Sequence, residues 1–443
     1  MKLLIRSIIA FILAVAIAGS AFASVSESEA ALTFSVAGVP APLRQEPQRI
    51  RWKDRTVKIA VSTSLLRPNA NIKFDSDVMG AVQRSLKAWQ EVADLQFDIS
   101  WGSDRQSVSP AGPAGDGISL ITIAASPENV LFFAKDAQTS SAKTRGFYNA
   151  KSFITEADIV LNPFQQFSTD GTFGTYDLQA TLTHEIGHLL GLHHSAVLGA
   201  TMADNIPRNG TFGLPDFSAR SLSDSDISAI RDLYGPNEGV HDCCAVVSGR
   251  LNFVGPRAGK SIRVWAEESE TGRVFGQVDL SGDGSFHLGG LPSGSYNLFW
   301  KGNTPSAGAP TAKFGSVDVE PGDAKTINQK IVPDATDLSL DYIGKNAQLA
   351  ESGISLEPGR EETVYLGGKG LDPTKLAVGF ASPFIHVDPA SLTGHDFGDG
   401  VSVISFVVSV DLGAPAGVYS LFTIDDKGSR AVMIGALNLN NPR

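Results

Sequence analysis

Residues 183–194 read Thr-His-Glu-Ile-Gly-His-Leu-Leu-Gly-Leu-His-His, and this stretch decides the fold class and the chemistry expected of the chain. On a helix, His184 and His188 lie four residues apart, so their rings project from one face and can bind one metal ion. Gly191 lets the chain turn sharply out of the helix and bring His194 back to the same ion. Three imidazole ligands leave the fourth zinc position open, as in catalytic sites. The sequence therefore predicts one catalytic Zn²⁺ held by His184, His188 and His194.

Glu185 follows the first of these histidines and is the predicted general base. Zinc lowers the pKa of a bound water to about 7. Glu185 would take the proton of that zinc-bound water, and the hydroxide would attack a peptide carbonyl before Glu185 passes the proton to the leaving amine. We therefore expect a zinc-dependent endopeptidase acting on protein or peptide substrates.

Two alternatives compete with this interpretation. The histidines could pack on an amphipathic helix without metal, but leucines and an isoleucine already supply the apolar face of that helix. The chain could instead be a non-catalytic, zinc-containing surface-binding or adhesion protein, although such a protein would often have lost Glu185. His193 is not counted as a ligand, because the spacing after Gly191 selects His194.

The pattern HExxHxxGxxH of residues 184–194 resembles the metzincin metallopeptidases, and Ser195 after the third histidine resembles the matrixin branch. Met202, in Ala200-Thr201-Met202, lies where the Met-turn of a matrixin would fall. The resemblance covers residues 49–235 and includes the final stretch LSDSDISAIRDLYG. It implies that Met202 forms a hydrophobic floor beneath the zinc and is not a ligand. It also implies an extended substrate on an edge strand, for which residues 129–134 are the candidate.

Several features depart from the matrixin pattern. No cysteine lies upstream for a cysteine switch, and no histidine precedes His184, which excludes a histidine-containing second zinc site of the animal type. The Met-turn continues as Ala203-Asp204, so the wall of the specificity pocket is expected to differ. Animal matrixins also bind calcium. The acidic, Gly-rich loops near Asp116 and Asp170 are Ca²⁺ candidates, although such loops are more often plain turns.

The first residues predict export. Lys2 and Arg6 precede an apolar run from Ile8 to Ala18, and Ala21-Phe22-Ala23 is a signal-peptidase type of site. We expect residues 1–23 to be a signal peptide cleaved after Ala23 and the protein to be secreted. No second apolar segment is long enough to span a bilayer, and the net charge of −11 disfavours nucleic acid as a partner.

The 443 residues suggest several domains. After a flexible lead-in or short pro-segment at 24–48, residues 49–239 alternate strands with helices at about 77–92 and 223–234, as in an α+β metzincin-type catalytic domain. Residues 240–332 and 333–443 have an almost purely β pattern. The stretch DGSFHLGGLPSGSYNL resembles a prealbumin-like β-sandwich, and the last segment is expected to be an immunoglobulin-like sandwich. Both would bind a surface or another protein, and residues 321–337 are expected to link them.

The chain has two cysteines, Cys243 and Cys244, which are adjacent. They could form a vicinal disulfide, bridge two chains or stay reduced.

Overall fold

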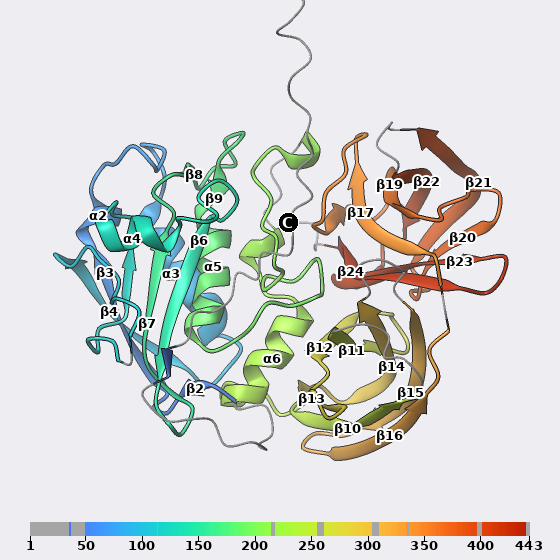
Figure 1. Ribbon diagram of the computed structural model, residues 1–443, viewed down its shortest axis with the longest axis horizontal. Helices are drawn as coiled ribbons and strands as arrows, with labels where there is room; N and C mark the ends of the chain where they lie inside the picture. Colours follow the sequence, from blue (N-terminus) through green and yellow to red (C-terminus); the bar gives the residue numbers. More distant parts are fainter. Residues whose placement is uncertain are drawn as a thin grey trace, which may run out of the picture. The chain divides into compact units, whose positions relative to one another are not determined.

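The structure is a computed structural model that describes residues 35–36, 49–112, 114–213, 218–254, 261–303, 310–334, 336–396 and 401–439 (Figure 1). The signal-peptide prediction and most of the predicted lead-in lie outside these residues. None of the helices among them combines the length and the apolar character needed to cross a bilayer.

A mixed sheet forms the framework of the N-terminal region. Its strands follow the order β1-β6-β7-β5-β3-β4, and β2 also pairs with β7. Only β6 and β7 are antiparallel within this sheet, as far as it is described. The strand bounds are β1 Ser35–Val36, β2 Arg51–Trp52, β3 Thr56–Ser62, β4 Gln96–Ser103, β5 Leu120–Thr122, β6 Ala142–Tyr148 and β7 Phe153–Leu161. A short pair, β8 Phe167–Ser168 and β9 Tyr176–Asp177, precedes the motif helix.

Two long helices and the sheet share one hydrophobic core. α3, Val78–Gln90, begins at Asp77, whose side chain accepts a hydrogen bond from the Gly80 backbone. α5, Leu178–Leu189, packs against α3, and the Trp89 indole donates to the Thr183 carbonyl over 2.9 Å. Val82, Leu86 and Trp89 recur at helical spacing and are all buried, so one face of α3 packs into the core.

The last helix of this region also begins as predicted. α6, Asp224–Tyr234, has a capping box in which Ser223 and Asp226 satisfy each other's backbone amides. The remaining helical turns are α2 Thr63–Leu66, η1 Thr211–Gly213 and η2 Ser218–Arg220.

The prediction that residues 129–134 form a strand is wrong. They lie largely in helix α4, Pro127–Phe132. The Ser126 side chain caps this helix by accepting from the Asn129 backbone, and Pro127 takes a first-turn position where its missing N–H costs nothing. These start signals outweigh the apolar run that had suggested a strand. The substrate edge therefore cannot be this segment.

Everything described after α6 is β-structure, in two modules of two sheets each (Figure 1). The first β module has sheets β13-β10-β16 and β12-β11-β14-β15 around one core. The second β module has sheets β17-β19-β22-β21 and β18-β24-β23-β20 around another. The two-sheet architecture of both modules confirms the all-β prediction for this half of the chain. The prealbumin-like and immunoglobulin-like types stay predictions.

The strands of the first β module are β10 Ala245–Phe253, β11 Ser261–Glu268, β12 Val274–Asp279, β13 Ser285–Leu291, β14 Gly294–Asn303, β15 Thr311–Val319 and β16 Ala324–Ile331. Those of the second are β17 Ser339–Lys345, β18 Ile354–Leu356, β19 Glu361–Lys369, β20 Leu376–Phe380, β21 Ile385–Asp396, β22 Ser402–Val410, β23 Gly417–Asp425 and β24 Arg430–Leu439.

The linker predicted at 321–337 is wrong over much of its length. Residues 324–331 form β16, which pairs in parallel with β10 over eight residue positions. The sequence gives little sign of this strand because most of its side chains are exposed and polar, as on an edge strand. Cys243 and Cys244, whose state the sequence left open, are joined by a disulfide.

Candidate metal centre

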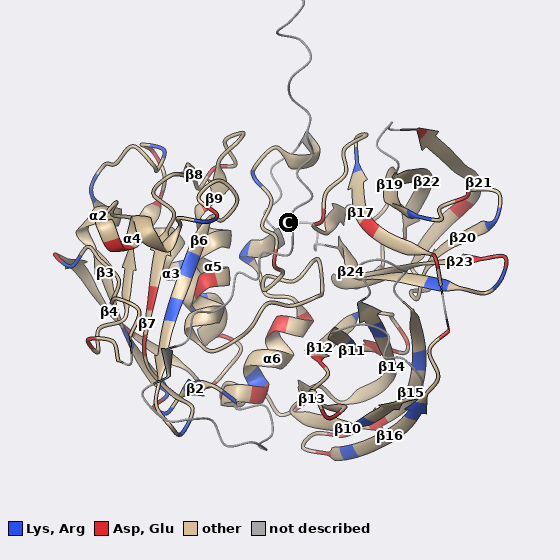
Figure 2. Ribbon diagram, in the orientation of Figure 1, with Lys and Arg blue, Asp and Glu red and all other residues tan. Residues whose placement is uncertain are grey.

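Helix α5 presents the first two histidines of the motif. Asp177 caps the helix by accepting a hydrogen bond from the Ala180 backbone over 2.8 Å. All twelve residues of α5 are buried, so the His184 and His188 rings point into a protected space. The acidic segment that Figure 2 shows on α5 is Glu185, the single carboxylate of that helix.

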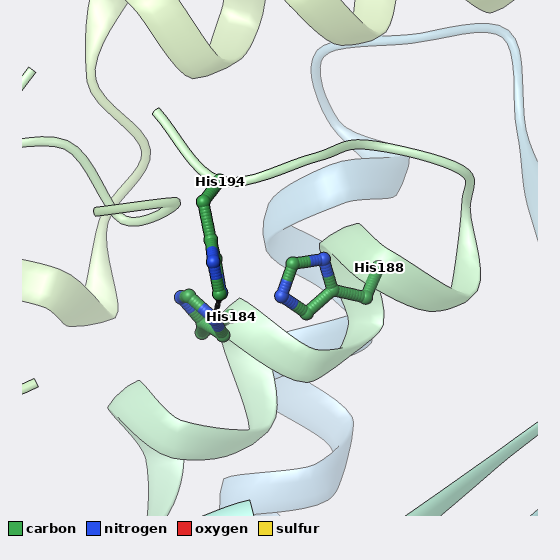
Figure 3. A group of neighbouring side chains, drawn as sticks. All are labelled: His184, His188 and His194. Carbon is green, nitrogen blue, oxygen red and sulfur yellow. Dashed lines mark hydrogen bonds between the residues drawn. The ribbon is translucent and has the colours of Figure 1, made fainter. Parts of the chain in front are cut away.

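Gly191 ends the helix and turns the chain back. Its φ is +100°, and a Cβ there would lie 2.2 Å from the Ile50 carbonyl oxygen, so a side chain would clash as well as strain the backbone. The Gly191 amide donates to the His188 carbonyl over 2.9 Å. This turn carries His194 over the face of α5 (Figure 3).

The three predicted ligands converge. One ring nitrogen from each of His184, His188 and His194 lies within 4.8 Å of the other two, and the Nε2 atoms of His184 and His194 are 3.3 Å apart. Figure 3 shows the three rings facing a common point from α5 and from the chain after Gly191. Among the described residues, this is the group of three metal-binding side chains that the structure brings together. His193 is exposed and outside the group, as expected.

The other ring nitrogens have partners that orient them. Nδ1 of His184 lies 2.8 Å from the Thr201 carbonyl oxygen, and Nδ1 of His188 lies 2.8 Å from that of Leu192. A carbonyl oxygen can only accept, so each Nδ1 carries the proton and each Nε2 keeps its lone pair. Burial lowers the pKa of His184 to about 4 and that of His188 well below its usual value. Neutral imidazoles with oriented lone pairs fit a zinc ion.

Asp204 is a partner that the sequence did not assign. Its Oδ1 lies 2.9 Å from Nδ1 of His194, and this hydrogen bond lowers the pKa of the Asp204 carboxyl. Each of the three candidate ligands therefore has a hydrogen-bond partner at Nδ1 that orients its ring. In the sequence, the only sign of this partner is that a carboxylate follows Met202 by two positions, where the chain departs from the matrixin pattern.

Replacing Asp204 with Ala is expected to raise the zinc dissociation constant about tenfold, because partners of this kind are worth roughly 10- to 100-fold in metal affinity and Asp204 is largely exposed. Competition with a chromophoric chelator measures the constant. Asp204→Asn keeps an acceptor oxygen and should show a smaller loss. Wild-type affinity in Asp204→Ala would contradict this role.

Glu185 is buried next to the three histidines. Its Oε2 accepts a hydrogen bond from Thr144 Oγ1 over 2.6 Å, which fixes the carboxylate against β6. Burial raises its pKa to about 7. A carboxyl group with this pKa is matched to taking and giving protons near neutral pH. Thr144, three positions into β6, is a second contributor that the sequence analysis did not find.

Met202 is buried against helix α5 at Gly187. It is 2% exposed, and a Cβ on Gly187 would lie 2.3 Å from its sulfur and 2.9 Å from an indole carbon of Trp89. The second variable position of the motif is therefore glycine because Met202 occupies the space of a side chain. Asp226 holds this turn by accepting from the Thr201 and Met202 amides over 2.8 and 3.1 Å. The capping residue of α6 thus also anchors the Met-turn.

Replacing Gly187 with Ala is expected to lower the free energy of unfolding by about 1–3 kcal/mol, the usual cost of overpacking, despite the better helix propensity of alanine. Urea denaturation measures it. Adding Met202→Ala opens the space, so the double variant should lose less stability than the sum of the single variants. Strict additivity would show that the two residues do not compete for this space.

The two loops considered for calcium have cationic partners within the chain. Asp116 forms an ion pair with Arg105, and Asp170 forms one with Lys73 at 2.8 Å. Neither carboxylate belongs to a group of three candidate ligands in the described part of the chain. The described carboxylates of both loops are thus engaged in ion pairs within the chain.

Comparison with known proteins agrees with this geometry. The profile of the matrixin family matches residues 129–235. Metalloendoproteinase 1 of Glycine max is 45% identical over 191 residues, covering 42% of this chain and 53% of that protein. The hatching enzyme of Paracentrotus lividus is 27% identical over 205 residues, covering 46% of this chain and 29% of that protein. The chain thus spans about half or less of the length of these relatives.

A solved structure, the major pilin subunit of Bacillus cereus, aligns with 43% of this chain and 66% of its own at 12% identity, with a TM-score of 0.17. A score this low supports no statement about the fold.

The three converging histidines at α5 and after Gly191, together with the family match, define a metzincin-like metallopeptidase region. Within that class, this part of the chain is a matrixin-like catalytic region.

Proposed function

We propose that this protein is a secreted zinc-dependent endopeptidase, with His184, His188 and His194 as metal ligands and Glu185 as general base. The observation that carries the proposal is the convergence of three oriented imidazoles beside a buried carboxylate. Secretion rests on the sequence pattern of residues 1–23. The prealbumin-like and immunoglobulin-like identities of the two β modules belong to the same proposal.

Zinc bound at this site would polarise the scissile carbonyl and make a water molecule acidic enough to react near neutral pH. Glu185 accepts the proton of the attacking water and donates it to the leaving amine. Thr144 holds the Glu185 side chain, so little reorganisation is needed when the proton moves. The hydrogen bond from Thr144 offsets part of the effect of burial on the Glu185 pKa, which favours the carboxylate form that the first step needs.

The substrate strand would lie along β6, in place of the segment that the sequence had suggested. β6 carries Thr144, which contacts Glu185. Within the described residues, one edge of β6 pairs with β7 and the other pairs only with the two-residue strand β1. Main-chain pairing with such an edge holds a peptide without demanding one sequence. β1 and a substrate would compete for this edge, which supports a role for residues 24–48 as a short pro-segment.

The basic residues of β6 are already paired. Figure 2 shows them as separate basic segments along the strand, and Lys143 contacts Asp136 at 2.8 Å and Arg145 contacts Glu128 at 2.6 Å. The edge therefore does not offer bare positive charge to an acidic substrate. Recognition by main chain and shape is the mode that this edge supports.

The test is cleavage of casein by the purified protein with and without a chelator such as 1,10-phenanthroline. We expect cleavage that the chelator stops and that added Zn²⁺ restores, with one zinc per chain by elemental analysis. A protein that binds one zinc and cleaves neither casein nor gelatin would support the alternative, a non-catalytic zinc-containing surface-binding or adhesion protein.

A further inference from the structure

The loop between His194 and Met202 begins at the third candidate ligand and ends beside Thr201, whose carbonyl oxygen lies 2.8 Å from Nδ1 of His184. It closes on itself where the Ser195 amide donates to the Met202 carbonyl over 2.7 Å, and Ser195 bridges to Ala203. Both ends of the loop therefore belong to the metal centre. Its middle, residues 196–200, leaves the N-terminal region and contacts both β modules.

The second β module receives the middle of this loop at strand β24. The Leu198 amide donates to the Ile434 carbonyl over 2.9 Å, and the Gly199 amide donates to the Gly435 carbonyl over 2.8 Å. Gly435 has φ +56°, and a Cβ there would lie 2.3 Å from a methyl of Val197. Glycine at these positions lets the two backbones approach closely enough to bond.

The first β module holds the loop through Gln277 of β12. Its side-chain oxygen accepts hydrogen bonds from the Ala196 amide over 3.0 Å and from the Ser195 hydroxyl over 3.4 Å. These residues directly follow His194. An apolar cluster then closes the junction with side chains from all three parts of the chain: Val197, Ala200, Trp265, Val274, Val418, Val432 and Ile434.

We infer that the two β modules are a structural part of the metal centre, and that Gln277 is a positioning residue for His194. The inference rests on the proposed zinc site. A metal site needs its ligands held to within about 0.5 Å, and a loop alone does not provide this. Here Gln277 fixes the start of the loop and β24 fixes its middle, so His194 is held from one side by Asp204 and from the other by the β modules.

The test uses the full-length chain with Gln277→Leu, which keeps the size of the side chain and removes the acceptor oxygen. We expect a zinc dissociation constant raised about tenfold in chelator competition, in line with the effect of outer partners on metal affinity. We also expect a lower kcat with KM unchanged within about twofold, because substrate pairing at β6 is not touched.

Two further variants separate positioning from stability. Gln277→Glu combined with Asp279→Asn keeps the acceptor oxygen and avoids two carboxylates at the 3.4 Å contact between residues 277 and 279, so near wild-type zinc affinity is expected. Val408→Ala removes buried apolar surface from β22, which lies in the sheet of the second β module that does not contain β24. It should lower the melting temperature and leave zinc affinity unchanged.

The outcomes distinguish this inference from the proposed function. Zinc affinity that is equal in wild type and Gln277→Leu would overturn the positioning role. Equal losses of affinity in Gln277→Leu and Val408→Ala would overturn it too, because general destabilisation would then explain both. A wild-type protein that binds zinc and shows the predicted affinity pattern without cleaving peptides would uphold the inference and remove the proposed peptidase function.

Discussion

Glu185→Gln is expected to lower kcat for peptide hydrolysis by about a thousandfold, within the range of roughly 10²–10⁴ that general acid–base catalysis contributes. Glutamine has the shape of glutamate, and its side-chain oxygen can still accept from Thr144 Oγ1, the contact that holds the native carboxylate at 2.6 Å. What is lost is the capacity to take a proton from water. Steady-state kinetics on a fluorogenic peptide, with zinc content measured in parallel, gives the result.

Zinc content separates loss of the base from loss of the site. Glu185 is not one of the three converging histidines, so Glu185→Gln should keep one zinc per chain and an unchanged melting temperature. Thr144→Val is the matched partner variant, because it removes the hydrogen bond and leaves the carboxylate. We expect a much smaller loss of kcat in Thr144→Val. Wild-type kcat in Glu185→Gln would remove Glu185 from the mechanism.

His188→Ala is expected to weaken zinc binding by a factor on the order of a thousand and to bring proteolysis below detection. Protein zinc sites bind with apparent free energies of roughly 10–16 kcal/mol, so losing one ligand costs several kcal/mol. His188 is buried on α5, and its ring is already oriented by the Leu192 carbonyl. Chelator competition and elemental analysis after dialysis measure the affinity and the zinc retained.

His193→Ala is the control for the same turn of chain. His193 neighbours His194, is exposed, and lies outside the three-histidine group, so its loss should leave zinc content and kcat unchanged. If His193→Ala lost zinc and His188→Ala kept it, the ligand assignment would be wrong.

Zinc would also stabilise the fold, since it binds the native site better than the unfolded chain. A ligand at 100 times its dissociation constant adds about 2.7 kcal/mol to the free energy of unfolding. The stabilisation by zinc should therefore be present in Glu185→Gln and absent in His188→Ala.

Local patterns were sufficient for several elements. The predicted helices at about 77–92 and 223–234 correspond to α3 and α6, whose caps, Asp77 and Ser223, act on amides two or three residues away. The apolar run near residue 130 misled because periodicity in so short a segment cannot separate strand from helix. The capping signals of Ser126 and Pro127 were the better guide there.

The residues that support the candidate metal centre from outside could not be predicted from local sequence patterns. Asp226 completes the capping box of α6, and it also anchors Met202, 24 positions earlier in the chain. Gln277 lies 81 positions from the amide it binds and carries no motif of its own. Such contacts depend on how separate parts of the chain pack, and no spacing rule within one element predicts them.

The sequence by itself determined the order and kind of the candidate ligands, the base beside them and the glycine that returns the chain, because these act within one helix and one turn. Only the tertiary structure decided why Gly187 is glycine, which atoms fix each histidine ring, and that β12 and β24 hold the loop after His194. These features arise where surfaces distant in sequence meet, and packing at those surfaces is a property of the whole fold.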